Sequence, residues 1–207
     1  ARSAVEESLR PGRRIGLHEA MLDQLRSQPT PDLAVLGHHA IGTGDPAVIL
    51  QVVPEGAAHA MASGAPRQAV TLWAAAIEAT VRSDHDKAAP FRLEKAKAWF
   101  DLGRRDDAEA ELQMALAHYR DQGDRHQVAE VLRLLSMSAS NGGEAERPIE
   151  IMQEAIELLE NEPPSPVLVE SHLGSARQAL ILRDGARGWA HIERARDLAS
   201  SLDDPAV

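Results

Sequence analysis

The stretch MASGAPRQAVTLWAAAI, residues 61–77, decides the fold of this chain. An apolar helical run ends at Ser63-Gly64, a short turn follows, and a second helix opens with small residues at Ala69 and Ala76. Glycine after a helix supplies a left-handed cap, and alanine favours helix while letting a neighbouring helix approach closely. The stretch therefore predicts two helices that pack as a pair.

The same pattern returns three more times along the chain. The small residue of the second helix recurs at a spacing of 39 or 40, as Ala76, Ala115, Ala155 and Ala195. Three positions earlier stands a large apolar residue, namely Trp73, Leu112, Met152 or Ile192. Seven positions earlier stands a small or turn-forming residue, namely Ala69, Ala108, Pro148 or Gly188. Twelve positions earlier the copies have Gly64, Gly103, Gly143 and, as the exception, Arg183. A chance coincidence of Ala-rich helices is the alternative, and the matching large residues argue against it.

This pattern resembles tetratricopeptide repeats, with a period longer than their usual one. The predicted fold class is all-α, a right-handed α-α superhelix built as a solenoid of antiparallel helix pairs. We expect the repeats to fill residues 46–203, with pairs at about 46–82, 87–121, 125–161 and 166–201. We expect a short connecting helix over 28–45, and residues 1–27 to be trailing helices of an upstream segment.

The composition narrows the possible functions. Aromatic residues are only 3% of the 207 residues, and strand-type alternation is nearly absent. The net charge of −10 argues against direct binding of nucleic acid, which requires a basic surface. Without cysteine there is no disulfide, thiolate metal site or thiol nucleophile. No apolar run is long enough to span a bilayer, so we expect a cytoplasmic protein with no membrane partner.

Three segments together resemble a known family: PGRRIGLHEAMLDQL (11–25), LGHHAIGTGD (36–45) and EGAAHAMASGAPRQAVTLWAAAI (55–77). They are similar to the helical region that follows the ATPase module in large LuxR-type bacterial transcriptional regulators, the MalT-like signal-transduction ATPases. The resemblance is greatest over residues 1–80, and the later pairs match only as generic repeats. It implies that residues 1–27 trail a winged-helix segment attached to the ATPase.

The resemblance implies a non-catalytic regulatory or sensor domain. Such a domain would bind a protein partner or a small effector, and would contact the ATPase and DNA-binding modules of its own full-length chain. The sequence departs from the full regulators because it contains no phosphate-binding loop and no recognisable helix-turn-helix. We therefore assign neither ATP hydrolysis nor promoter binding to these residues. A homo-oligomer is left open.

Two other functional classes remain as alternatives to a regulatory domain. The chain could be the accessory domain of a nucleotide cyclase or another enzyme with the same repeat tail, or a free-standing scaffold protein. The flanking sequence distinguishes them: a cyclase module in place of a DNA-binding one would indicate the first, and a native Met just before Ala1 the second.

No residue pattern indicates catalysis, a cofactor or a metal. The adjacent pair His38-His39 points in directions about 100° apart on a helix, and metal ligands on a helix are better spaced by four residues. We expect packing or surface roles for both. Trp73, Trp99 and Trp189 fall at interhelical positions, so we expect them to belong to the core rather than to a ligand-stacking site.

The predicted binding region is a polar stripe on the first helices of the pairs, which line the concave surface in tetratricopeptide-like stacks. Its expected groove-lining residues are Glu94, Lys97, Asp101, Glu130, Arg133, Ser136, Glu170 and Arg177. The alternative for each residue is an ordinary solvated helix face.

The repeat register makes a prediction for Ala115. Replacing Ala115 by Arg inserts a long charged side chain at a helix contact, so the free energy of unfolding should fall by several kcal/mol, on the order of 2–4. Thermal or urea denaturation measures the change. An unaltered melting curve would show that the register is wrong.

Overall fold

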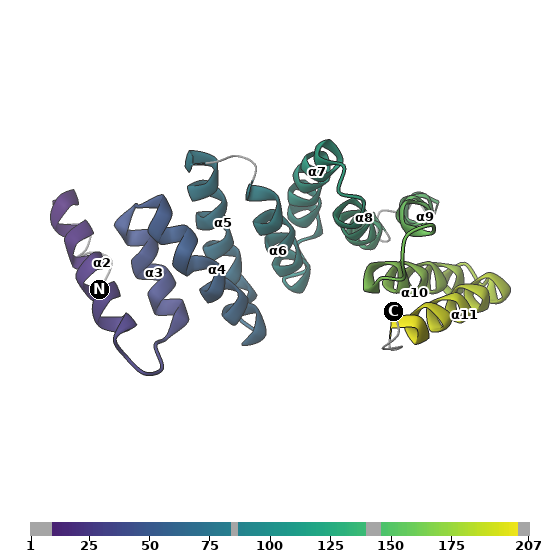
Figure 1. Ribbon diagram of the computed structural model, residues 1–207, viewed down its shortest axis with the longest axis horizontal. Helices are drawn as coiled ribbons and strands as arrows, with labels where there is room; N and C mark the ends of the chain where they lie inside the picture. Colours follow the sequence, from purple (N-terminus) through teal and green to yellow (C-terminus); the bar gives the residue numbers. More distant parts are fainter. Residues whose placement is uncertain (1–9, 84–86, 140–145, 203–207) are drawn as a thin grey trace. The chain divides into compact units, whose positions relative to one another are not determined.

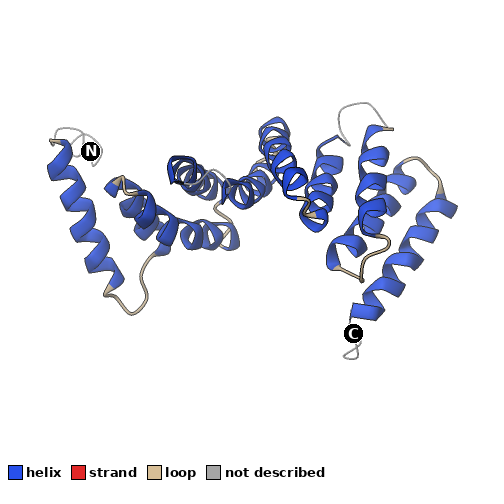
Figure 2. Ribbon diagram, turned by 45° about the horizontal axis from the view of Figure 1, so that its top comes forward, coloured by secondary structure: helices blue, strands red, loops and turns tan. Residues whose placement is uncertain are grey.

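The structure is a computed structural model that describes residues 10–83, 87–139 and 146–202 (Figure 1). Every regular element in these ranges is a helix and none is a strand (Figure 2), which confirms the all-α class. The helices are α2 (Pro11–Arg26), α3 (Leu33–Thr43), α4 (Pro46–Ala62), α5 (Pro66–Ser83), α6 (Ala88–Asp101), α7 (Arg105–Gln122), α8 (Arg125–Ala139), α9 (Arg147–Leu159), α10 (Pro166–Ile181) and α11 (Gly185–Leu202). Among the helices of these ranges, none is both long and apolar enough to cross a lipid bilayer.

The chain forms two compact units, Ala1–Glu111 and Leu112–Val207, and the boundary falls inside α7. In the first unit α2, α3, α4 and α5 each pack against the next helix along the chain. In the second unit α8 packs on α9, α10 packs on α11, and α10 also contacts both α8 and α9. Contacts between successive helices are the property of a helical repeat, in which each element is buried mainly by its neighbours.

The alanine of each second helix is at a buried position. Ala76, Ala115 and Ala155 are fully buried, and Ala195 is 2% exposed. These residues belong to α5, α7, α9 and α11, which we call the B helices; α4, α6, α8 and α10 are the A helices. The predicted register is thereby confirmed. Met114, adjacent to Ala115 but 55% exposed, provides a matched control position for the Ala115→Arg substitution.

In two of the copies the large residue packs against the following A helix. Trp73 of α5 stacks on Phe91 of α6, with ring centroids 5.6 Å apart and an interplanar angle of 22°. Met152 of α9 fills the space beside Gly174 of α10 so closely that a Cβ at Gly174 would lie 2.5 Å from the Met152 Cε. In the last copy Ile192 is only partly buried, and no helix of the described residues follows α11.

The turns inside the pairs share one backbone geometry. Gly64 and Gly103 have φ of 71° and 70°, and in each turn the next residue donates its N–H to a carbonyl five residues earlier: Ala65 to Ala60, and Arg104 to Trp99. This is the Schellman arrangement that ends a helix on a left-handed residue. The predicted capping roles of Gly64 and Gly103 are confirmed, whereas Gly143 lies outside the described residues.

Arg183 takes the same left-handed conformation as the glycines it replaces. Its φ is 60°, and among the described residues it is the only non-glycine residue with a positive φ. The Asp184 N–H donates to the Ala179 carbonyl at 2.9 Å, as the equivalent residues do in the other turns. The fold therefore imposes the turn on a residue that disfavours it, because the Cβ of an L-residue crowds the backbone in this region.

Several helices begin at a side-chain cap. Asp32 and Asp45 cap α3 and α4 by accepting hydrogen bonds from the N–H groups of Ala34 and Ala47, at 2.9 and 2.8 Å. Ser165 caps α10 in the same way by accepting from the Leu168 N–H. These bonds satisfy N–H groups that have no partner inside the helix.

Helix α2 buries only part of its apolar face. His18 and Leu22 are buried, and Leu25 packs against the core of the first unit. Ile15, Leu17 and Met21, by contrast, are 38%, 49% and 39% exposed. The apolar face of α2 is therefore broader than the surface that α3 covers.

The strained turn predicts that Arg183→Gly will stabilise the fold. Glycine adopts positive φ without steric cost, and the gain is partly offset by its greater freedom in the unfolded chain, leaving about 0.5–1 kcal/mol. Urea denaturation of the chain measures the change. Gly103→Ala is the matched control: a Cβ there meets nothing within 4 Å, so only backbone strain should act and stability should fall. A destabilised Arg183→Gly variant would contradict this account.

Candidate functional site

The predicted stripe residues of the first unit lie on α6. Glu94 and Lys97 are partly exposed and form an ion pair with each other at 2.9 Å, and Asp101 is exposed at the end of the helix. A pair separated by three residues on one helix face contributes little to stability. The two charges therefore lie at the surface without being fixed by the core.

The predicted residues of the second unit divide into two groups. Glu130 and Arg133 of α8 form a two-pronged ion pair with distances of 2.8 and 3.0 Å, and Glu170 and Arg177 of α10 are exposed. Ser136 is fully buried, and its hydroxyl donates to the Pro148 carbonyl at 2.7 Å. Ser136 is therefore wrong as a groove residue, because it satisfies a backbone group at the α8–α9 contact.

One cavity of the first unit is a cleft beside Trp99. It has a volume of about 370 Å³ and is lined by Arg67, Val70 and Thr71 of α5, Trp99 of α6, and Leu102 and Arg104 of the turn into α7. Trp99 and Leu102 pack on one side against the core of the unit and remain partly exposed on the other. The cleft thus combines an apolar floor with two arginines.

Sequence reasoning missed this cleft, although the repeat contains a signal for it. In the register of the B-helix alanines, the position of Trp99 is occupied by Ala60, Ala139 and Ala179 in the other copies. Ala60 and Ala179 are buried at helix contacts. An indole cannot occupy the space of a methyl group, so Trp99 is a local departure from the packing rule, and we had expected it to belong to the core.

The arginines of the cleft differ in their partners. The Arg104 guanidinium lies over the Trp99 ring, 5.2 Å from its centroid, and forms an exposed ion pair with Asp107 at 2.6 Å. No described carboxylate pairs with Arg67. Because the Arg104–Asp107 pair is exposed and separated by three residues, it is weak enough to open for a better anion.

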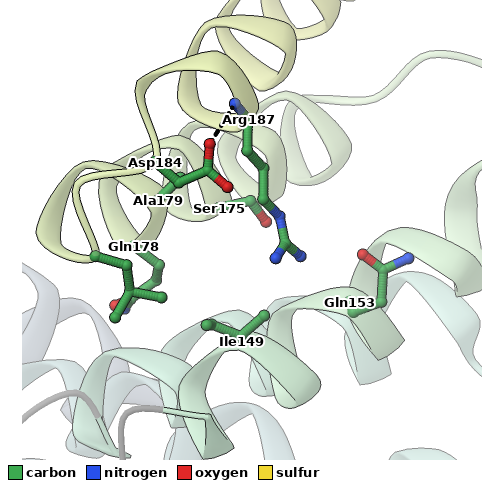
Figure 3. A pocket seen from close by; sticks show the side chains of 8 residues that line it. Ile149, Gln153, Ser175, Gln178, Ala179, Asp184 and Arg187 are labelled. Carbon is green, nitrogen blue, oxygen red and sulfur yellow. Dashed lines mark hydrogen bonds between the residues drawn. The ribbon is translucent and has the colours of Figure 1, made fainter.

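A second cavity lies in the other unit between α9, α10 and the start of α11 (Figure 3). Figure 3 shows the Arg187 guanidinium reaching toward the space between Ile149 and Gln153, while the Arg187 N–H donates to the Asp184 carboxylate. The cavity has a volume of about 20 Å³. This is room for about one water molecule, so the cavity is too small for an organic ligand.

Histidines meet in pairs at two helix contacts. In the first unit His18 of α2 and His39 of α3 approach with Nδ1 atoms 3.0 Å apart, and the His38 ring is 5.7 Å from His18. The His18 ring lies so close to Gly42 that a Cβ there would come within 2.3 Å of it. In the part of the chain that the structure describes, no group of three or more His, Asp or Glu residues could hold a metal ion.

The second pair is His172 of α10 and His191 of α11, again with Nδ1 atoms 3.0 Å apart. Burial, together with the neighbouring His191 and Arg194, lowers the pKa of His172 to about 4. Burial and Arg187 lower the pKa of His191. The His172 Nε2 is buried without a hydrogen-bond partner, so a proton added there would be an uncompensated charge.

Three crystal structures resemble the chain over most of its length. BtubC (BKLC) from P. vanneervenii matches with a TM-score of 0.62 and 14% identity, over 91% of this chain and 72% of that one. MamA matches with a TM-score of 0.60 and 13% identity, over 91% of this chain and 93% of that one. A putative kinesin light chain from Podosopora anserina with nearly identical TPR-like repeats matches with a TM-score of 0.60 and 12% identity, over 97% of this chain and 92% of that one. The fold is a TPR-like helical repeat.

At these identities the likeness concerns the fold alone. No protein-family model matches the chain, and neither does any curated protein. The TPR-like fold agrees with the tetratricopeptide resemblance of the repeats, and it leaves the LuxR-type resemblance as a separate hypothesis. The binding residues must therefore be argued from this chain's own geometry.

The histidine pair predicts a pH dependence of stability. As the pH falls from about 6.5 to about 4, the unfolded chain gains a proton at His172 that the folded chain does not bind, so the free energy of unfolding decreases by up to about 3 kcal/mol. His172→Gln removes this contribution, so its urea-denaturation curves should vary less between about pH 7 and about pH 4.5 than those of the parent. Equal pH dependence in both proteins would contradict the assignment.

Proposed function

We propose that this chain is a non-catalytic regulatory domain that binds a partner through its TPR-like helix pairs. The observation that supports this most is the packing register, in which alanines and large apolar residues of the B helices make the contacts between neighbouring helices. Polar side chains of the A helices remain accessible rather than being used for packing: Glu170 and Arg177 are exposed, and Glu94 is partly exposed. Stacked repeats present such side chains over an extended surface, which suits recognition of another protein.

We further propose that the parent protein is a multidomain, cytoplasmic LuxR-type transcriptional regulator with an ATPase and a DNA-binding module. The support is the resemblance of three segments, which the structure places on α2, α3 and the α4–α5 pair. The exposed apolar residues Ile15, Leu17 and Met21 of α2 suit a contact with a preceding module of the same chain. In this role the domain would transmit the binding of an effector or partner to the ATPase.

The complete reading frame tests the regulator hypothesis directly. We expect a phosphate-binding loop upstream and a DNA-binding helix pair downstream of these residues. A reading frame that contains neither would rule the hypothesis out, and a cyclase module in place of the DNA-binding one would favour the enzyme-accessory alternative.

The contact of α2 can be tested with the purified ATPase module of that reading frame. Met21→Asp should weaken its association with this chain by about tenfold or more, because it places a charge in an apolar contact. Leu202→Asp, at a similarly exposed leucine of α11, is the control and should have no effect. Analytical ultracentrifugation measures both. Equal association of the two variants and the parent would contradict the contact.

A further inference from the structure

We propose that the cleft beside Trp99 is a binding site for a small organic anion that contains an aromatic ring. This goes beyond the proposed function, because it assigns a ligand class to a defined site, and it does not depend on the regulator hypothesis. The proposal is based on the charge of the cleft, the nature of its floor and its size.

The charge of the cleft favours an anion. Arg67 and Arg104 line the same space in a chain whose net charge is −10. In the repeat register the other copies have Asp106, Glu146 and Ala186 in place of Arg67, and Ala65, Glu144 and Asp184 in place of Arg104. At this junction two adjacent copies thus place arginines where the other copies have acidic residues or alanine, and guanidinium groups bind carboxylate and phosphate through paired hydrogen bonds.

The floor of the cleft favours a ring. Val70, Leu102 and the exposed part of Trp99 provide an apolar surface. Because the Arg104 guanidinium lies over the indole, an anionic group bound to Arg104 brings an attached ring alongside Trp99. Aromatic rings gain from offset or edge contacts with an indole beyond the area that they bury.

The size of the cleft favours a small molecule over a peptide segment. Its volume of about 370 Å³ lies near the lower end of the range of about 300–1,000 Å³ typical of small-molecule sites. The Thr71 hydroxyl donates to the Arg67 carbonyl at 3.2 Å, so its oxygen is available as an acceptor for a ligand hydroxyl or amine. One ring and one anionic group fit these features.

Calorimetric titration of the whole chain with two probes, AMP and benzoate, and three control compounds tests the proposal. AMP and benzoate each join an anionic group to a ring, adenosine and benzyl alcohol have a ring without the charge, and inorganic phosphate has the charge without a ring. We expect AMP or benzoate to bind with a Kd of about 1 mM or tighter, and its neutral counterpart and phosphate to bind at least about tenfold more weakly.

Three variants locate the site. Arg67→Gln and Trp99→Ala should each weaken binding of that probe at least about tenfold. Trp99→Ala introduces the residue that the other three copies have, so it should fold, which circular dichroism verifies. Arg105→Gln, at an exposed arginine outside the cleft, is the matched control and should bind like the parent.

Several results would overturn the proposal. They are absence of binding by both AMP and benzoate, equal binding of a neutral counterpart or of phosphate alone, and equal loss in the Arg105→Gln control. An acidic peptide that binds in an Arg67-dependent manner when neither AMP nor benzoate does would show that the cleft is a protein-docking site instead. The reading-frame result for the regulator hypothesis is independent of all of them.

Discussion

The close packing of one alanine in each B helix is the constraint on which the structure depends. A methyl side chain lets two helices approach until their backbones set the distance, and a large neighbour three residues earlier then reaches the next helix. Trp73 on Phe91 and Met152 beside Gly174 are two examples of this second contact. A chain with only 3% aromatic residues can therefore stack helices without a large central core, because each pair is buried by its neighbours.

The departures from this rule are more informative than the rule itself. Trp99 occupies an alanine position, and the space around its exposed part becomes a cleft with two arginines. Arg183 occupies a glycine position, and the backbone bends into the left-handed turn nonetheless. The turn persists because the hydrogen bond from the Asp184 N–H to Ala179 and the packing of α10 on α11 outweigh a local strain of about 1–2 kcal/mol.

Charged and titratable groups divide between the surface and the helix contacts. The Glu94–Lys97 ion pair lies at the surface, where it adds little stability. His172 and His191 meet inside the α10–α11 contact, where the neutral form is favoured and the lowered pKa follows from burial. Exposure thus decides whether the charged form of a side chain is tolerated at its position.

The sequence by itself determined the helical class, the repeat register and the caps, because these depend on local propensity and on a spacing that repeats. Ala76 and Ala155 are buried and Gly64 and Gly103 are left-handed because their roles require only near neighbours. The tertiary structure alone decided which polar residues are accessible. Ser136 was assigned to a groove but is buried against Pro148, and Trp189 was assigned to the core but is 60% exposed. The Trp99 cleft likewise joins residues from α5, α6 and the next turn, and their meeting depends on how whole helices pack, which periodicity along the chain does not specify.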